Sequence, residues 1–172
     1  RLQQPDADAL NAEGRVLRVR IEQLIRLFDK RFPIYVLVTQ CDRIYGWEDW
    51  AAQLKPEALG QAMGYLAAHD EPAFLDRAFD HVGERLAALR LLLAQTPDAA
   101  TPAMLMFPNE LAQLKAGLRL FLDACFREHA YLEQPFLRGV FFSSGWQGGG
   151  AASALLPGAL ADVTSHAPGR NG

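Results

Sequence analysis

The sequence has few cysteines, little net charge and no long apolar run, and each shortage excludes a class of protein. Its two cysteines, Cys41 and Cys125, lie in apolar segments without a pairing pattern. They favour a reducing compartment over a disulfide framework. Acidic and basic residues are interspersed and leave a net charge of −3. The chain therefore lacks the basic stripe that nucleic-acid-binding proteins carry.

Sequence features of membrane spans, phosphate loops and metal sites are missing as well. No apolar run approaches the roughly 20 residues that cross a bilayer, and no segment has the features of a signal peptide. The pattern G-x-x-x-x-G-K-[S/T] does not occur, so we expect no loop that cradles phosphates or seats Mg²⁺. The histidines stand far apart, without metal-ligand spacing, and predict no metal site: His69, His81, His129 and His166.

The apolar content is sufficient for one hydrophobic core. Half of the 172 residues are hydrophobic, which predicts a single domain. Residues 1–14 are polar and predict a flexible lead-in, residues 15–160 the domain itself, and residues 161–172 a disordered tail. The sequence starts at Arg1 rather than at a methionine, from which we expect a piece of a longer protein.

An unbroken apolar run over residues 34–38 and a second, largely apolar run over residues 137–142 predict β-strands. Runs of this kind indicate strands that are buried on both faces, as in a parallel sheet. Both end in small polar residues, so we expect the strands to pair in parallel with both polar exits at one sheet edge. An amphipathic helix over residues 15–31 precedes the first strand and is expected to pack on the sheet.

The sequence between the two strands is predominantly helical. A 4-3 stripe from Leu75 to Leu93 predicts a helix over residues 72–95, in an intramolecular bundle because the stripe is too short for a coiled coil. Pro108 is expected to start a second amphipathic helix over residues 108–129, after a short buried strand or plug. Trp47 and Trp50 share one helical face and indicate either core packing or a partner contact. The predicted fold class is a helix-rich α/β domain with two parallel strands and a helical insertion at about residues 47–130.

The polar exits of the strands are the candidate site, because ligands of open α/β sheets bind at the carboxyl ends of strands. The first exit has the T-x-x-D layout of the guanine-specificity element of the GTPase fold, with an aspartate to accept hydrogen bonds from the base. Gln40 stands where that element has a lysine. The plainer alternative is an exposed turn without a ligand. The candidate nucleotide-binding residues are Thr39, Gln40, Asp42, Ser143, Ser144 and Gly145. Cys41, beside Asp42, is expected to have a raised pKa and not to act as a nucleophile.

Three segments in order resemble the IcmF/TssM family of type VI secretion proteins. They are residues 32–42 with Gly46-Trp47, residues 106–111 (MFPNEL), and residues 137–149 (LRGVFFSSGWQGG). The sequence departs from the family pattern at Gln40, Trp47 and Gly149, where the family has lysine, phenylalanine and glutamate. The resemblance implies the C-terminal half of a cytoplasmic, partial P-loop GTPase-like domain, at the cytoplasmic face of the bacterial inner membrane.

The resemblance further implies a structural and interaction role among the membrane-complex and baseplate subunits of the secretion apparatus. No catalytic activity and no cofactor are expected of this chain alone, although the resemblance allows GTP or ATP with Mg²⁺ as ligands of the full-length domain. Arg77 and Arg90, on the charged face of the 72–95 helix, are the candidate partner-binding residues. Two alternatives remain: a nucleotide hydrolase that uses Asp42 and Ser144 once an upstream half is joined, and an unrelated helical adaptor.

Overall fold

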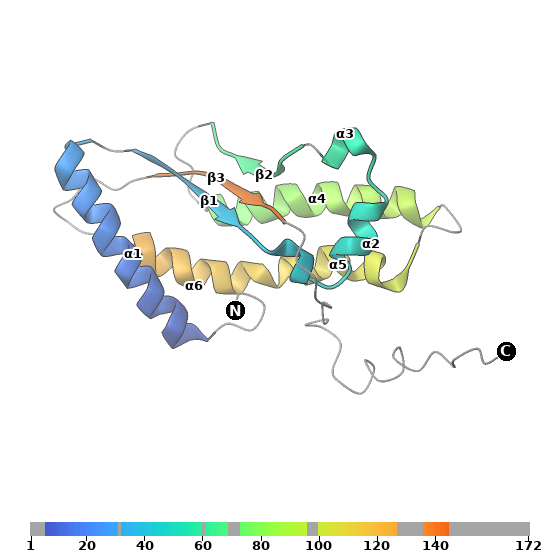
Figure 1. Cartoon of the computed structure of the whole chain (residues 1–172), viewed down its shortest axis with the longest axis horizontal. Coiled ribbons are helices and arrows are strands. Elements are labelled where there is room, and N and C mark those ends of the chain that lie inside the picture. The colour runs from blue at the N-terminus through green and yellow to red at the C-terminus, as the bar shows by residue number, and fades with distance from the viewer. Residues whose placement is uncertain are drawn as a thin grey trace.

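A computed structural model describes residues 6–30, 32–59, 61–68, 73–95, 100–126 and 136–144. Over these residues the protein is rich in helix and has one small mixed sheet (Figure 1). In chain order the elements are α1 (Ala7–Phe28), β1 (Pro33–Val38), the 3-10 turn η1 (Cys41–Arg43), α2 (Trp47–Ala52), α3 (Pro56–Leu59), β2 (Met63–Leu66), α4 (Phe74–Ala94), α5 (Pro102–Ala112), α6 (Leu114–Phe126) and β3 (Phe136–Phe142).

The sheet has the strand order β1-β3-β2. β1 and β3 pair in parallel, with Val36 opposite Val140 and Val38 opposite Phe142. The prediction that these two strands pair in parallel is therefore confirmed. β2, which the sequence did not predict, pairs antiparallel with β3. Because β2 lies within residues 47–130, the segment expected to be a helical insertion also contributes a strand to the sheet.

Helix α4 lies along one face of this sheet and packs on β2 (Figure 1). Val140 is fully buried on that face, and the Phe79 ring of α4 meets the Phe142 ring edge-on with 5.7 Å between ring centroids. On the opposite face of β1, Tyr35 is 54% and Leu37 60% exposed. The prediction that the strands are buried on both faces is therefore wrong for β1, because no described element covers this outer face.

The first helix is longer than predicted and packs elsewhere. The Asp6 carboxylate accepts a hydrogen bond from the Ala9 N–H (3.1 Å), and this N-cap starts α1 at Ala7. Residues 7–14 thus belong to a helix rather than to a flexible lead-in. α1 packs mainly against α6 instead of the sheet. A Cβ on Gly14 would lie 2.6 Å from the Ala124 Cβ, so glycine permits this close crossing.

The predicted helix over residues 108–129 is replaced by two helices, α5 and α6, which separate at Gln113. α5 starts at Pro102, because the Thr101 hydroxyl accepts the Met104 N–H (3.1 Å) as an N-cap. Pro108 consequently lies inside α5 rather than at a helix start. Residues 104–107, expected to be a strand or plug, are helical and include the fully buried Phe107. The helix predicted over residues 72–95 is confirmed as α4.

The predicted tail, residues 161–172, and the candidate Gly145 lie outside the described residues. Over the residues that the structure does describe, no helix is both long enough and apolar enough to cross a membrane.

Candidate functional site at the strand exits

The polar exits of β1 and β3 meet at one edge of the sheet, as the parallel pairing predicts. The Ser143 N–H donates to the Val38 carbonyl (2.8 Å), and the Cys41 N–H donates back to the Ser143 carbonyl (3.2 Å). These two backbone bonds continue the strand pairing past the ends of the strands. They bring two turns into contact that are about 100 residues apart in the sequence.

The centre of the site is the pair formed by Asp42 and Ser144. The Ser144 hydroxyl donates to Oδ1 of Asp42 (2.5 Å), and the Asp42 N–H donates to Oγ of Ser144 (3.2 Å). Asp42 is only 6% exposed. A buried carboxylate needs hydrogen-bond donors in place of water, and Ser144 supplies one. The Asp42–Ser144 pair therefore ties η1 to the end of β3.

This geometry limits what Asp42 can do for a ligand. A carboxylate that reads guanine must present its oxygens to the base, whereas Oδ1 of Asp42 is already engaged and the residue is buried. A base would have to displace the Ser144 hydroxyl or use the second oxygen from a buried position. The alternative of an exposed turn aspartate is wrong, because Asp42 is buried at the strand exits.

Three further described residues of the predicted nucleotide site, Thr39, Gln40 and Ser143, lie in the same turns. Thr39 and Gln40 are exposed. Gln40 has a left-handed backbone (φ 60°), and its side-chain oxygen accepts a hydrogen bond from Nη1 of Arg43 (3.4 Å). Ser143 contributes its backbone to the strand exit, as described above, and its side chain is exposed.

Cys41, next to Asp42, is a structural thiol. It is 1% exposed, and its Sγ donates to the Val38 carbonyl (3.5 Å). The pKa of Cys41 is raised to about 11: burial is the largest cause, the hydrogen bond from the Ser143 backbone opposes it, and the Asp42 charge adds to it. The predicted increase in the pKa is confirmed, although burial rather than the neighbouring carboxylate is its largest cause. The thiol therefore stays protonated at neutral pH and is a poor nucleophile.

Next to the first turn, α2 contacts η1 and carries two tryptophans of an aromatic cluster. The Trp47 and Trp50 rings lie 5.5 and 5.3 Å from the Phe107 ring, measured between centroids. Trp50 is 3% exposed, so of the two alternatives, core packing or a partner contact, core packing is correct for Trp50. Asp49, in the first turn of α2, accepts a hydrogen bond from the Thr101 hydroxyl (2.9 Å) and thereby links α2 to the start of α5.

Glu110 is a buried residue that the sequence reasoning missed. It is 0% exposed within α5 and is held by an interaction inside the protein. A charged residue directly before Leu111, on a largely apolar helix, was the signal that could have identified it.

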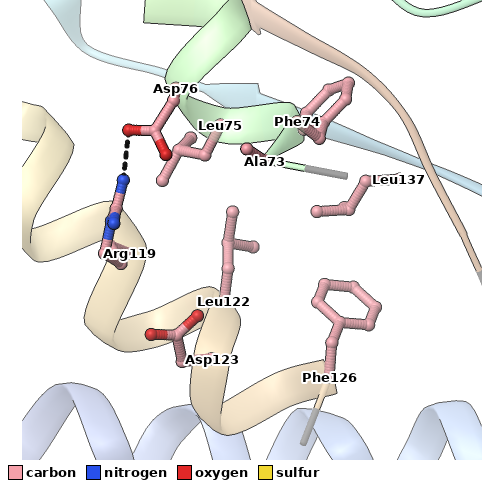
Figure 2. A pocket seen from close by; sticks show the side chains of 9 residues that line it. All are labelled: Ala73, Phe74, Leu75, Asp76, Arg119, Leu122, Asp123, Phe126 and Leu137. Carbon is pink, nitrogen blue, oxygen red and sulfur yellow. Dashed lines mark hydrogen bonds and ion pairs between the residues drawn. The ribbon is translucent and has the colours of Figure 1, made fainter. Parts of the chain in front are cut away.

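A cavity of about 250 Å³ lies elsewhere, between the start of α4, the end of α6 and β3 (Figure 2). Asp76 bonds both Arg119 and Lys115, the latter at 2.9 Å, and these bonds, led by the one from Lys115, lower the pKa of Asp76. Arg119, the basic residue that lines the cavity, is thus already paired with Asp76. No residue of the turns that hold Asp42 and Ser144 lines this cavity. Most of the residues that line the cavity are apolar. The full lining is Ala73, Phe74, Leu75, Asp76, Arg119, Leu122, Asp123, Phe126 and Leu137.

The two candidate partner-binding residues differ in their surroundings. Arg77 is exposed on α4. Arg90 is half-buried, and its Nη1 donates to the Leu105 carbonyl of α5 (3.4 Å). The expectation that both arginines point outward is therefore wrong for Arg90, which holds α4 against α5.

Over the described part of the chain, no three histidine, cysteine or acidic side chains gather closely enough to hold a metal ion. His81 instead packs against Tyr65 with the two rings tilted at 56° and 5.5 Å between their centroids. The other three histidines lie outside the described residues.

Comparisons with known proteins identify the family. Residues 1–171 match the family model described as the IcmF-related N-terminal domain. The type VI secretion system component TssM1 of Pseudomonas aeruginosa is 34% identical over 155 residues, which cover 84% of this chain and 14% of that protein. The chain thus spans about one-seventh of the length of this relative. No solved structure matches.

The matched family model also corrects one expectation. It describes an N-terminal domain, whereas the resemblance implied the C-terminal half of a GTPase-like domain. Because the match extends over nearly the whole chain and agrees with the relative, this chain belongs to the IcmF/TssM family, as an IcmF-related N-terminal domain.

Proposed function

We propose that this domain is a structural and interaction component of a type VI secretion apparatus and has no catalytic activity of its own. The similarity to TssM1, a component of that system by name, supports the assignment to the apparatus. We expect its partners to be other membrane-complex and baseplate subunits, and its place to be the cytoplasmic face of the inner membrane. Any attachment to the membrane would come from parts of a longer polypeptide.

The Asp42–Ser144 pair is the observation that carries the structural role. The Asp42 carboxylate at the strand exits is buried and accepts a hydrogen bond from the Ser144 hydroxyl, so it stabilises the turn instead of facing a ligand. The sequence also lacks a phosphate loop. Most nucleotide affinity in P-loop proteins comes from contacts to the phosphates and to Mg²⁺.

Isothermal titration calorimetry with GTP and Mg²⁺ tests this proposal. We expect no binding in the micromolar range. The Ser144→Ala variant is the informative companion, because it removes the hydroxyl that engages Oδ1 of Asp42. If the 172-residue chain bound GTP with a micromolar dissociation constant, and Asp42→Asn abolished that binding, the domain would be a nucleotide-binding module and the structural proposal would fail.

The second candidate is a nucleotide-hydrolysing domain that forms when the chain is joined to an upstream half. The position of Asp42 at a strand exit favours it. The Ser144→Ala variant separates the two functions: tighter GTP binding by this variant would support a latent base-binding carboxylate. Unchanged absence of binding supports the structural role.

A further inference from the structure

The helix α1 packs through one face and exposes apolar residues on another. It lies at one end of the described elements, beside α6 (Figure 1), and its buried residues include Ile21 and Ile25. Elsewhere on the helix Val16 is 66%, Val19 52% and Leu27 73% exposed. Contiguous exposed apolar groups are uncommon on soluble monomers and mark interaction surfaces.

The exposed apolar residues form one stripe along the second half of α1. Val16, Val19, Gln23 and Leu27 follow one another at steps of three and four residues, so they share one side of the helix. With about 3.6 residues per turn, this stripe lies opposite the side that is buried against α6. The contact with α6 therefore does not cover it.

Arginines flank this stripe on both sides. By the same helical geometry Arg15 and Arg26 lie on one side of it and Arg20 on the other, and all three are exposed. Nη1 of Arg20 donates to the neutral side-chain oxygen of Gln23 (3.2 Å), so this bond does not neutralise its charge. The stripe is thus apolar along its centre and basic along both margins.

The acidic residues of this part of the chain lie outside that arrangement. Glu22 is half-buried and forms an ion pair with Arg18 (2.8 Å). Asp29 follows α1 as its C-cap, and Asp8 and Glu13 precede Arg15. On a chain with a net charge of −3, the second half of α1 is therefore a local basic surface, which the interspersed charges of the sequence did not indicate.

We propose that this surface of α1 contacts an anionic phospholipid membrane. We define it as the basic–apolar face, formed by Arg15, Val16, Val19, Arg20, Arg26 and Leu27. The helix lies in the plane of the membrane interface, where the apolar stripe enters the boundary between headgroups and acyl chains and the long arginine side chains reach the lipid phosphates.

The inference rests on the proposed place of the domain at the cytoplasmic face of the inner membrane, a leaflet surface that carries negative charge. It adds a contact made by the domain itself, which is distinct from any anchor in a longer polypeptide. Such a contact orients the domain on the membrane, because one amphipathic helix binds a bilayer weakly and reversibly compared with a spanning helix.

A phospholipid surface fits both parts of the basic–apolar face. Anionic headgroups complement the arginines, and the acyl boundary receives the stripe between them. A second copy of the chain fits less well, because a two-fold contact through this face would bring like-charged arginines together. A strongly acidic protein would pair with the arginines, but its charged surface would not cover the apolar stripe.

Co-sedimentation of the 172-residue chain with vesicles tests the proposal. The probe is vesicles with about 30% phosphatidylglycerol in phosphatidylcholine, and vesicles of phosphatidylcholine alone are the neutral arm. We expect the chain to bind the anionic vesicles about tenfold or more tightly than the neutral ones, and less tightly as salt is raised. No binding to the anionic vesicles at about 0.1 M salt would overturn the proposal.

Charge variants locate the contact on α1. The double variant Arg15→Gln with Arg26→Gln should bind the anionic vesicles about 20-fold more weakly, since each basic residue near such a surface contributes about fivefold. The matched control, Lys55→Gln with Arg85→Gln, makes the same change in net charge at exposed positions outside α1, and should bind almost as tightly as the wild-type chain. Circular dichroism verifies that both variants fold. Equal losses in the two double variants would overturn the proposal, because net charge rather than α1 would then control binding.

A fluorophore on the stripe reports whether α1 enters the interface. Cys41 and Cys125 are 1% and 3% exposed, so a polarity-sensitive dye that reacts with thiols labels the thiol introduced by Leu27→Cys. Its emission should shift to the blue on anionic vesicles. The same dye at Gln95→Cys, an exposed position after α4, should show no shift. Any other pattern would contradict insertion of α1.

The two other occupants of the face would give different results. Dimerisation without lipid that Leu27→Ser abolishes would assign the face to a second copy. Binding of a secretion subunit that the Arg15 and Arg26 double variant weakens, without any binding to vesicles, would assign it to a protein. Either result would overturn the proposal. Vesicle binding is measured without nucleotide, so its failure is distinguishable from a failure of the proposed function, which the GTP titration tests.

Discussion

At the scale of single residues, the strand exits are held together by one buried acid and one hydroxyl. Asp42 and Ser144 are separated by 102 positions in the sequence and exchange two hydrogen bonds. Such a contact stabilises the fold most when the acid is shielded from water, as Asp42 is. Its role is therefore to fix the distance between η1 and the end of β3.

Replacing Ser144 by alanine should lower the free energy of unfolding by about 1–3 kcal/mol, because it leaves a buried carboxylate oxygen without its donor. Urea denaturation measures this change. Ser143→Ala is the matched control: the side chain of Ser143 is exposed, and its backbone supplies the bonds to β1. A Ser144→Ala variant as stable as Ser143→Ala would show that the pair contributes nothing to stability.

Cys41 makes stability depend on pH in the alkaline range. Burial raises the pKa of Cys41 from 9.0 to about 11. Between these values an unfolded thiol loses its proton while the folded one keeps it, so the folded state binds more protons and stability falls as pH rises. The stabilising effect is complete below pH 9 and lost through about pH 11. Cys125 adds a similar dependence, since burial raises its pKa to about 11 as well.

Urea denaturation at about pH 8 and about pH 10 checks this dependence. We expect the wild-type chain to lose more stability between the two conditions than Cys41→Ala does, whatever the stability of the variant at pH 8. The comparison of changes removes the contribution of lysine and tyrosine titration, which both proteins share. Identical losses would contradict the raised pKa.

At the scale of elements, the position of α2 depends on a glycine. Gly46 precedes α2 with φ at +83°, and a Cβ there would lie 2.0 Å from the Ala103 carbonyl oxygen. Both the left-handed backbone and the close approach to α5 exclude a side chain. The aromatic cluster of Trp47, Trp50 and Phe107 forms only when this approach is possible.

Gly46→Ala should therefore destabilise the domain by more than about 2 kcal/mol, from backbone strain combined with the steric clash. Gly83→Ala is the matched control within α4, because a Cβ there meets nothing within 4 Å. It should stabilise the helix by about 0.5–1 kcal/mol. Thermal unfolding of the two variants gives opposite shifts if this account is right, and shifts of the same sign would refute it.

At the scale of the whole molecule, α4 presents a charged surface on the side away from the core. Arg77, Asp80 and Glu84 are exposed on it, while Phe79, Val82 and Leu86 are buried on the opposite side. Arg90 does not belong to this surface, because it donates to the Leu105 carbonyl. A test of partner binding should therefore change Arg77 and leave Arg90 intact.

Arg77→Glu should change the free energy of unfolding by no more than about 0.5 kcal/mol, as exposed substitutions usually do. If this surface contacts secretion subunits, the reversal should weaken their association through like-charge repulsion. Pull-down of the membrane-complex and baseplate subunits measures the association, with circular dichroism as the folding control. Lys55→Glu, an exposed reversal near α3, is the matched variant. Binding that is unchanged by Arg77→Glu would leave α4 a purely structural helix.

The sequence by itself determined the features that depend on local pattern. Apolar runs identified residues 34–38 and 137–142 as strands, and their shared polar exits predicted the parallel pairing that β1 and β3 show. Regular 4-3 spacing identified α4. Backbone conformation in these segments follows from neighbouring residues, so periodicity was sufficient. Three ordered motifs also indicated the family, which the comparisons confirmed.

Only the tertiary structure decided the features that depend on distant contacts. β2 is four residues long and exists because it pairs with β3, and Pro108 lies inside α5 because a cap at Thr101 starts that helix earlier. The sequence placed Asp42 and Ser144 at the same sheet edge, but their burial and mutual bonding depend on side-chain geometry across 102 positions. Burial on both faces, inferred from an apolar run, depends on which elements are present to cover the strand, and that is a property of the assembled sheet rather than of its residues.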